Sequence, residues 1–84
     1  MDKYTIYGKD NCKFCIMSKR LLEAKNLQYD EVKIPDDIDV ETLKDRIKSL
    51  GVDKKISSVP QIVYGNTYIG GFNDLKTFLN FENA

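Results

Sequence analysis

Short strand-like and helix-like segments alternate along this sequence, and their order restricts the fold more than any other feature. β-Branched and aromatic residues at 4–7 end at Gly8 and predict a short buried strand. Residues 13–26 contain no Gly or Pro and predict a helix. The alternating pattern at 28–34, ended by Pro35, predicts a second strand. A strand, a helix and a strand joined so closely should form a parallel, right-handed unit.

The next predicted element is a helix that begins after Asp39. Asp39 is a good N-cap residue, and Gly51 fits the left-handed position just past a helix end. Between them, apolar residues recur at steps of three or four and so form one stripe along the predicted helix. This stripe consists of Val40, Leu43, Ile47 and Leu50.

The remaining segments predict a hairpin and a last helix. Residues 61–64 and 67–69 are apolar and β-prone, and the Gly65-Asn66 pair between them is typical of a tight antiparallel hairpin. Gly70-Gly71 allows close backbone approach before residues 72–81, which have helical periodicity. The order βαβαββα therefore predicts an α/β fold with a four-stranded mixed sheet.

Length, charge and composition exclude several classes of protein. The 84 residues, without repeats or linkers, are expected to form a single domain over residues 1–84. Basic and acidic residues number 13 each, so the overall positive charge that nucleic-acid binders use is missing. The chain also lacks an apolar run of the roughly 20 residues that span a membrane, and an export signal. We expect a cytoplasmic monomer that binds neither nucleic acid nor membranes.

The two cysteines, Cys12 and Cys15, are spaced as Cys-x-x-Cys between the first strand and the first helix. A zinc site at such a pair needs further ligands, and the sequence has no His and no other Cys. A structural disulfide would close a very small ring and contribute little stability. Redox chemistry is the interpretation that these residues support.

The position of the pair at a helix start gives the two cysteines different roles. Unpaired N–H groups and the positive end of the helix dipole stabilise a thiolate at Cys12, which is the predicted nucleophile. Lys9 and Lys13 add positive charge nearby. Cys15, one turn later and less exposed, is the predicted resolving cysteine. It releases the product by closing the Cys12–Cys15 bridge after a mixed disulfide has formed.

Three segments of the sequence resemble the glutaredoxin family. The heptapeptide K-D-N-C-K-F-C at 9–15 resembles K-x-x-C-P-Y-C, S-V-P-Q-I at 58–62 resembles T-V-P-Q-I, and I-G-G-F-N-D-L at 69–75 resembles I-G-G-x-x-D-L. Their order and spacing agree over essentially the whole chain. The resemblance implies a thioredoxin-like fold and a glutathione–disulfide oxidoreductase. Such an enzyme reduces protein disulfides and glutathione mixed disulfides, and ribonucleotide reductase is a plausible target.

The resemblance also implies a glutathione site. In the family the bond before the motif proline is cis, here Val59–Pro60, and the Val59 backbone pairs with the cysteinyl part of glutathione. Asn73 and Asp74 would receive the γ-glutamyl group, although they could also serve only as helix caps. Lys9 would bind the glycyl carboxylate. With glutathione as co-substrate and no metal, the implied binding set is Lys9, Phe14, Ser58, Val59, Pro60, Gly71, Asn73 and Asp74.

Departures from the family pattern leave alternatives open. Lys13 replaces the motif proline and Phe14 the motif tyrosine, so the redox potential does not follow from the resemblance. Ser57 stands where many relatives have a basic residue, so either Lys54 or Lys55 substitutes for it or this contact is lost. One alternative function is a glutaredoxin-like thioredoxin reduced by thioredoxin reductase. Another is a protein that binds or carries an iron–sulfur cluster.

Overall fold

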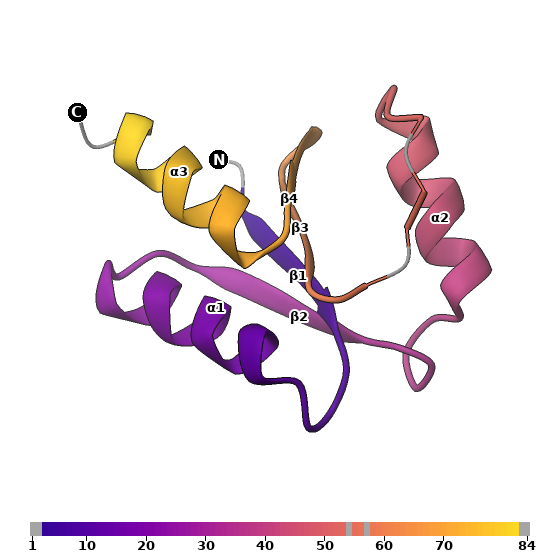
Figure 1. The fold of residues 1–84 in the computed structure, drawn as a ribbon, viewed down its shortest axis with the longest axis horizontal. Coiled ribbons are helices and arrows are strands. Elements are labelled where there is room, and N and C mark those ends of the chain that lie inside the picture. Colours follow the sequence, from indigo (N-terminus) through magenta and orange to yellow (C-terminus); the bar gives the residue numbers. More distant parts are fainter. Residues whose placement is uncertain (1–2, 54, 57, 83–84) are drawn as a thin grey trace.

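The computed structural model describes residues 3–53, 55–56 and 58–82, and it contains strands and helices in the predicted order βαβαββα (Figure 1). Their ends differ from the predicted ones by one or two residues. None of the helices in this described part is long and apolar enough to cross a membrane. The elements are β1 (Tyr4–Gly8), α1 (Lys13–Ala24), β2 (Tyr29–Lys33), α2 (Val40–Ser49), β3 (Gln61–Tyr64), β4 (Thr67–Gly70) and α3 (Phe72–Glu82).

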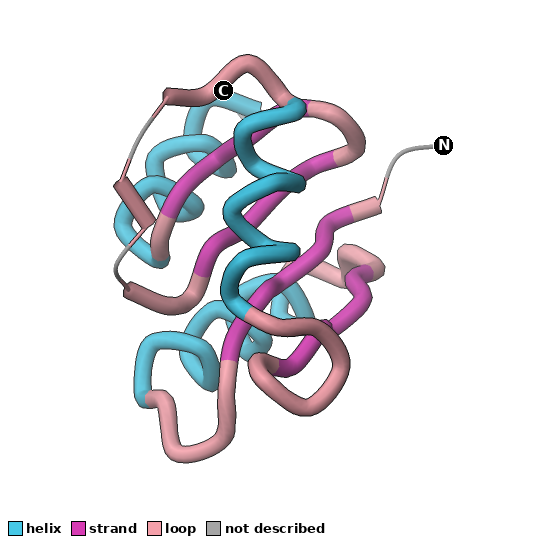
Figure 2. The backbone as a smooth tube through the Cα atoms, turned by 90° about the vertical axis from the view of Figure 1, so that its right-hand side faces the viewer, coloured by secondary structure: helices cyan, strands magenta, loops and turns pink. Residues whose placement is uncertain are grey.

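The strands form one mixed sheet in the order β2-β1-β3-β4. β1 runs parallel to β2, as the short crossover through α1 predicts, and Tyr4 lies opposite Tyr29. β3 is antiparallel to both β1 and β4, so the predicted hairpin is confirmed. Figure 2 shows α2 crossing in front of the sheet, with α1 and α3 behind it.

Each face of the sheet carries its own apolar core. Because successive side chains of a strand point to opposite faces, Ile6 and Tyr7 of β1 belong to different clusters. On one face, α1 and α3 contribute the buried side chains Leu22, Leu75 and Leu79. On the other face, α2 contributes Leu43 and Ile47. β1 therefore ends between two packed layers. The cysteine pair lies just after this end of the strand.

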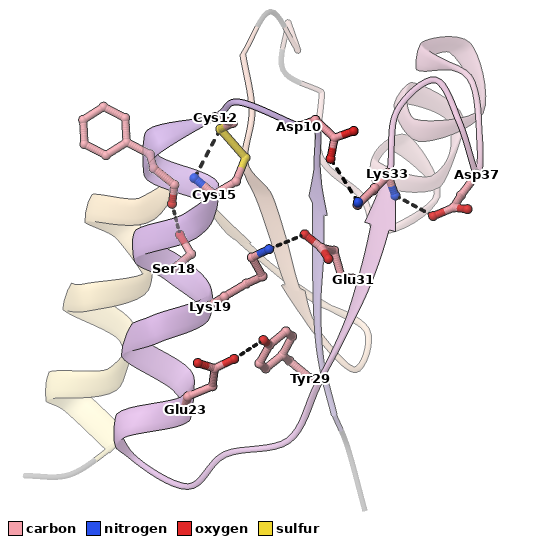
Figure 3. A network of polar contacts seen from close by, with 11 residues as sticks. Asp10, Cys12, Cys15, Ser18, Lys19, Glu23, Tyr29, Glu31, Lys33 and Asp37 are labelled. Carbon is pink, nitrogen blue, oxygen red and sulfur yellow. Dashed lines mark hydrogen bonds and ion pairs between the residues drawn. A yellow bond between two sulfur atoms is a disulfide. The ribbon is translucent and has the colours of Figure 1, made fainter.

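Polar contacts join α1 to the neighbouring strand β2 (Figure 3). Lys19 Nζ lies 2.8 Å from Glu31 Oε2. Tyr29 Oη donates a hydrogen bond of 2.5 Å to Glu23 Oε2. This hydrogen bond, together with partial burial and the nearby carboxylates, raises the pKa of Tyr29 to about 12. The contacts fix α1, and with it the start of the helix, against the sheet.

The start and end of α2 follow the prediction, and its apolar stripe is only partly buried. Asp39 Oδ1 accepts a hydrogen bond of 2.7 Å from the Thr42 N–H, and Gly51 has φ +86°. Leu43 and Ile47 are buried, whereas Val40 remains 44% exposed. Val40 is the first residue of α2, and its side chain borders a surface hollow rather than the sheet.

Candidate active site

The two cysteines lie at the first turn of α1 and are joined in a disulfide (Figure 3). Cys12 is the N-cap residue, and its Sγ accepts a hydrogen bond of 3.2 Å from the Cys15 N–H. Cys12 is 7% exposed and Cys15 only 1%. A backbone N–H directed at sulfur stabilises negative charge there, and Cys12, which receives this hydrogen bond, is also the more exposed residue of the pair.

The loop before β3 faces the cysteine pair. Val59 O lies 3.8 Å from Cys12 Sγ, and the Val59–Pro60 peptide bond is cis, as the family resemblance implied. The peptide bond between Ile34 and Pro35 is also cis, which the sequence pattern did not predict. The Val59 backbone is therefore the backbone segment that a ligand bound to Cys12 would meet.

The Gln61 side chain fixes the loop before β3 through hydrogen bonds at both ends of its amide. The side chain is only 5% exposed, and its Nε2 donates a hydrogen bond of 2.8 Å to Ser58 O. Its Oε1 accepts a hydrogen bond of 2.5 Å from Tyr68 Oη on β4. Both ends of the buried amide are thus satisfied, which is what burial of such a group requires. Gln61 belongs to a family segment, but sequence reasoning assigned it no role.

A hollow of about 240 Å³ opens beside Cys12, between the loop before β3 and the start of α3. It collects every residue of the expected glutathione set except Lys9, and it adds Phe72. The Phe72 ring stacks on Phe14 with centroids 5.9 Å apart, and Lys76 Nζ lies 5.4 Å from the Phe72 centroid. Phe72 directly follows the two glycines, which is the signal that sequence reasoning passed over. The lining is Phe14, Ser58, Val59, Pro60, Gly71, Phe72, Asn73 and Asp74.

Lys9 lies on the other side of Val59. It is exposed and lines a second hollow of about 200 Å³, which shares Ser58 and Val59 with the first. Lys54 and Ser57, considered from the sequence as partners of a glycyl carboxylate, lie outside the described residues. Lys55 lines a third hollow and does not line the one that contains Lys9. The predicted cation therefore stands next to the main hollow rather than within it.

Asp74 caps α3 and remains exposed at the same time. Its Oδ2 accepts a hydrogen bond of 3.0 Å from the Gly71 N–H, the reach-back of a third helical residue to the N-cap. Gly70 has φ +123°, and a Cβ there would lie 2.5 Å from Asp74 Oδ2. A Cβ on Gly71 would make only ordinary contacts. Asp74 can therefore occupy this position only because residue 70 is a glycine. The Asp74 carboxylate caps the helix and still remains accessible to a ligand.

The glutaredoxin family model matches residues 4–69. This chain belongs to the glutaredoxin family. Glutaredoxin 1 of Rickettsia prowazekii is 39% identical over 70 residues, which cover 83% of this chain and 70% of the relative. The structure of glutaredoxin 1 from Francisella tularensis in complex with cacodylate superimposes with a TM-score of 0.80 over the whole of both chains at 32% identity. The buckwheat glutaredoxin–glutathione complex shares the fold, with a TM-score of 0.71, 17% identity and coverage of 96% of this chain and 71% of that one.

Family membership confirms the predicted thioredoxin-like fold and the predicted class of activity. This glutaredoxin is a thiol–disulfide oxidoreductase, and Cys12 and Cys15 are its redox cysteine pair. The comparisons do not favour the thioredoxin-like or cluster-binding alternatives. Within the described ranges, no group of three or more His, Cys, Asp or Glu side chains could hold a metal ion.

The loop that leads into the redox pair of this glutaredoxin is tied to β2. Lys33 Nζ lies 2.9 Å from Asp10 Oδ1 (Figure 3), and this carboxylate raises the pKa of Lys33. The Lys33 N–H also donates a hydrogen bond of 2.8 Å to Asp37 Oδ2. Asn11, with φ +59°, turns the chain into α1. Lys33 thus compensates the one negative side chain of the segment from Lys9 to Cys12.

Proposed function

We propose that this glutaredoxin uses glutathione to reduce disulfides in proteins and mixed disulfides between proteins and glutathione. The observation that supports the proposal is the hollow beside Cys12, because the Val59 backbone, whose carbonyl oxygen lies 3.8 Å from Cys12 Sγ, and the Asp74 carboxylate both line it. Family members act with glutathione and disulfide substrates. Action in the cytoplasm, as a monomer, and on ribonucleotide reductase among other disulfide proteins rests on the family resemblance.

The charges around the hollow suit the two ends of glutathione. Asp74 is an exposed carboxylate at one end, suited to the ammonium of the γ-glutamyl group. The start of α3 supplies N–H groups for the neighbouring carboxylate. Lys9, beyond Val59, is suited to the glycyl carboxylate. The Val59 backbone between them would pair with the cysteinyl residue, which brings the glutathione sulfur to Cys12.

The chemistry follows from the asymmetry of the two cysteines. The Cys12 thiolate attacks a disulfide, one sulfur leaves as a thiolate and takes a proton, and a mixed disulfide forms on Cys12. With a glutathionylated protein, the protein thiol leaves and a second glutathione then releases oxidised glutathione from Cys12. With a protein disulfide, Cys15 loses its proton and attacks Cys12 instead. In the second case two electrons pass from the thiol pair to the substrate disulfide. In the first case one reduced glutathione is consumed, and it leaves joined to the glutathione that came from the substrate.

A coupled assay of NADPH oxidation tests the proposal. The purified protein is supplied with a disulfide substrate and either glutathione plus glutathione reductase or thioredoxin reductase alone. We expect turnover only in the first arm. Turnover only with thioredoxin reductase, or in neither arm, would overturn the assignment of glutathione as reductant.

A further inference from the structure

A chain of three surface hollows leads away from the cysteine pair along α2. The second hollow shares Ser58 and Val59 with the hollow beside Cys12, and it shares Ile56 with the third, which has a volume of about 220 Å³. The second is mainly apolar, and Lys9 lies at it together with Ile34, Val40, Leu43 and Ile56. The third is basic, lined by Lys44, Lys48, Val52, Asp53, Lys55 and Ile56. These two hollows form what we call the α2 groove.

One row of side chains on α2 borders both parts of the groove. Val40, Lys44 and Lys48 are spaced by four residues and therefore lie on one face of the helix. The first and last members are about 12 Å apart along the axis, at 1.5 Å per residue. Val40 is 44% exposed, which is unusual for the apolar stripe of a helix that packs on a sheet. This face of α2 thus exposes one apolar side chain, Val40, followed by two lysines, and it lies next to the reactive site.

The basic end of the groove carries more positive than negative charge. Among its described lining residues, three lysines face the single carboxylate of Asp53. Lys44 also forms an ion pair of 3.5 Å with Glu41, but both side chains are exposed, and such pairs are weak and easily exchanged for another partner. The groove therefore attracts negative charge at the end far from Cys12.

We infer that the α2 groove binds the acidic segment that flanks the attacked cysteine of a protein disulfide substrate. The inference rests on the proposed function and names a substrate class for the same site. An apolar side chain near the cysteine occupies the second hollow, and an acidic side chain lies over Lys44 and Lys48. An extended chain rises about 3.3 Å per residue, so the acidic residue stands about four residues beyond the apolar one. Glutathione is assigned to the stretch from Asp74 to Lys9. It is therefore too short to reach Lys44 and Lys48 as well.

The reaction in the groove is the dithiol reduction already described. Reduced protein, with a Cys12 thiolate and a Cys15 thiol, transfers two electrons to the substrate disulfide and becomes the Cys12–Cys15 disulfide. The substrate leaves with two thiols, one proton coming from Cys15 and the other from solvent. Glutathione takes no part in this half-reaction. Its rate therefore reports recognition of the protein segment separately from the binding of glutathione.

Single-turnover reduction of peptide disulfides by the pre-reduced protein tests the inference, with the peptide dithiol measured after acid quenching. One peptide carries Leu near the attacked cysteine and Glu four residues further out, and its partner carries Gln instead of Glu. Both are made with the segment on either side of the cysteine. For one of the two directions we expect the Glu peptide to react about tenfold faster at low ionic strength, an advantage that salt removes. Equal rates in both directions would contradict the inference.

Two double variants locate the effect. Lys44→Gln/Lys48→Gln should abolish the preference for the Glu peptide. The matched control is Arg20→Gln/Lys25→Gln, which removes the same charge from two exposed positions. Arg20 lies in α1 and Lys25 just after it, on the opposite face of the sheet from α2. This variant should retain the preference for the Glu peptide. Equal loss in the two variants would show a general charge effect and overturn the inference. Oxidised glutathione is run beside the peptides: its failure to react with wild-type protein counts against the proposed function, not against the groove.

A third variant tests the apolar part of the groove. Val40→Ser should slow the Leu peptide several-fold and leave a peptide with Gly at that position unchanged, because only the first loses apolar contact. Val40 is exposed, so the substitution leaves the core intact. An equal effect on both peptides would contradict the assignment of the second hollow.

Discussion

A Cβ on Gly8 would lie only 2.7 Å from the Sγ of Cys15. The end of β1 therefore lies against the more deeply buried cysteine of the redox pair. The space beside the Cα of Gly8 holds a hydrogen atom but is too small for a methyl group. Gly8 does not have a positive φ, so the requirement is steric rather than conformational. The glycine sets where Cys15 stands relative to Cys12.

Gly8→Ala should impair the dithiol reaction more than the monothiol reaction. The methyl group displaces Cys15, which resolves protein disulfides, whereas glutathione can resolve its own mixed disulfide without Cys15. We expect overpacking to lower the free energy of unfolding by about 1–3 kcal/mol. Rates with a protein disulfide and with a glutathione mixed disulfide, together with urea unfolding, measure both effects.

Gly51→Ala is the control for the Gly8 variant. Gly51 has φ +86°, and a Cβ there would meet only open space, so alanine strains only the backbone at the end of α2. Stability should fall by about 1–2 kcal/mol with no change in the ratio of the two rates. A matching change of ratio in both variants would mean that stability, not the position of Cys15, determines the ratio.

Gln61→Leu should weaken the use of glutathione as well as the fold. Loss of the buried amide removes the hydrogen bond to Ser58 O and the acceptor for Tyr68 Oη. We expect a loss of about 1–3 kcal/mol in the free energy of unfolding, together with a raised KM for the glutathione mixed disulfide. Tyr68→Phe removes only the second hydrogen bond, so it should lower stability with little change in KM. An unchanged KM in Gln61→Leu would show that the loop keeps its place without the amide.

Phe72→Ala should raise the KM for the glutathione mixed disulfide by about two- to tenfold, the equivalent of an aromatic pair of about 0.5–1.5 kcal/mol. The reason is that Phe72 and Phe14 stack beside the hollow and hold the starts of α1 and α3 together. Phe72→Tyr keeps the stack and should behave as wild type. Lys76→Gln removes the cation near the ring without opening the hollow, and a KM change of the same size there would assign the effect to charge.

The cap of α2 makes stability dependent on pH. Hydrogen bonds from Thr42 to the Asp39 carboxylate lower the pKa of Asp39. A carboxyl whose pKa is lowered on folding contributes stability above its unfolded value, and that contribution is lost as the pH falls through the folded value. Wild type should therefore exceed Asp39→Asn in stability at neutral pH, and the difference should vanish in acid. Urea midpoints for both proteins across this range test it, and a constant difference would contradict the charge effect.

Local signals in the sequence were sufficient for the fold because each element carries its own start and stop. Asp39 and Gly51 bound α2, and Gly65-Asn66 fixes the hairpin. Helical spacing identified Val40 as part of the apolar stripe of α2, but spacing alone does not say how far a neighbouring layer extends. The hollow beside the first turn of α2 leaves that position uncovered.

Within the site, the residues found from the sequence were those in family segments, and those missed act through three-dimensional contacts. Gly8 looked like a strand end, since its closeness to Cys15 appears only when β1 and α1 pack. Phe72 gained its role from a ring on another helix, Phe14. Gln61 was visible in the sequence, but its two hydrogen bonds depend on the folded hairpin.

The most direct test of the account is the fate of oxidised glutathione on the single-cysteine variants. Cys15→Ser protein should form a stable mixed disulfide with glutathione on Cys12, located by peptide mass mapping, and should keep turning over glutathione mixed disulfides. Cys12→Ser should form no such adduct and show no turnover. Turnover by Cys12→Ser, or an adduct on Cys15 instead, would contradict the assignment of Cys12 as the glutathione-linked nucleophile.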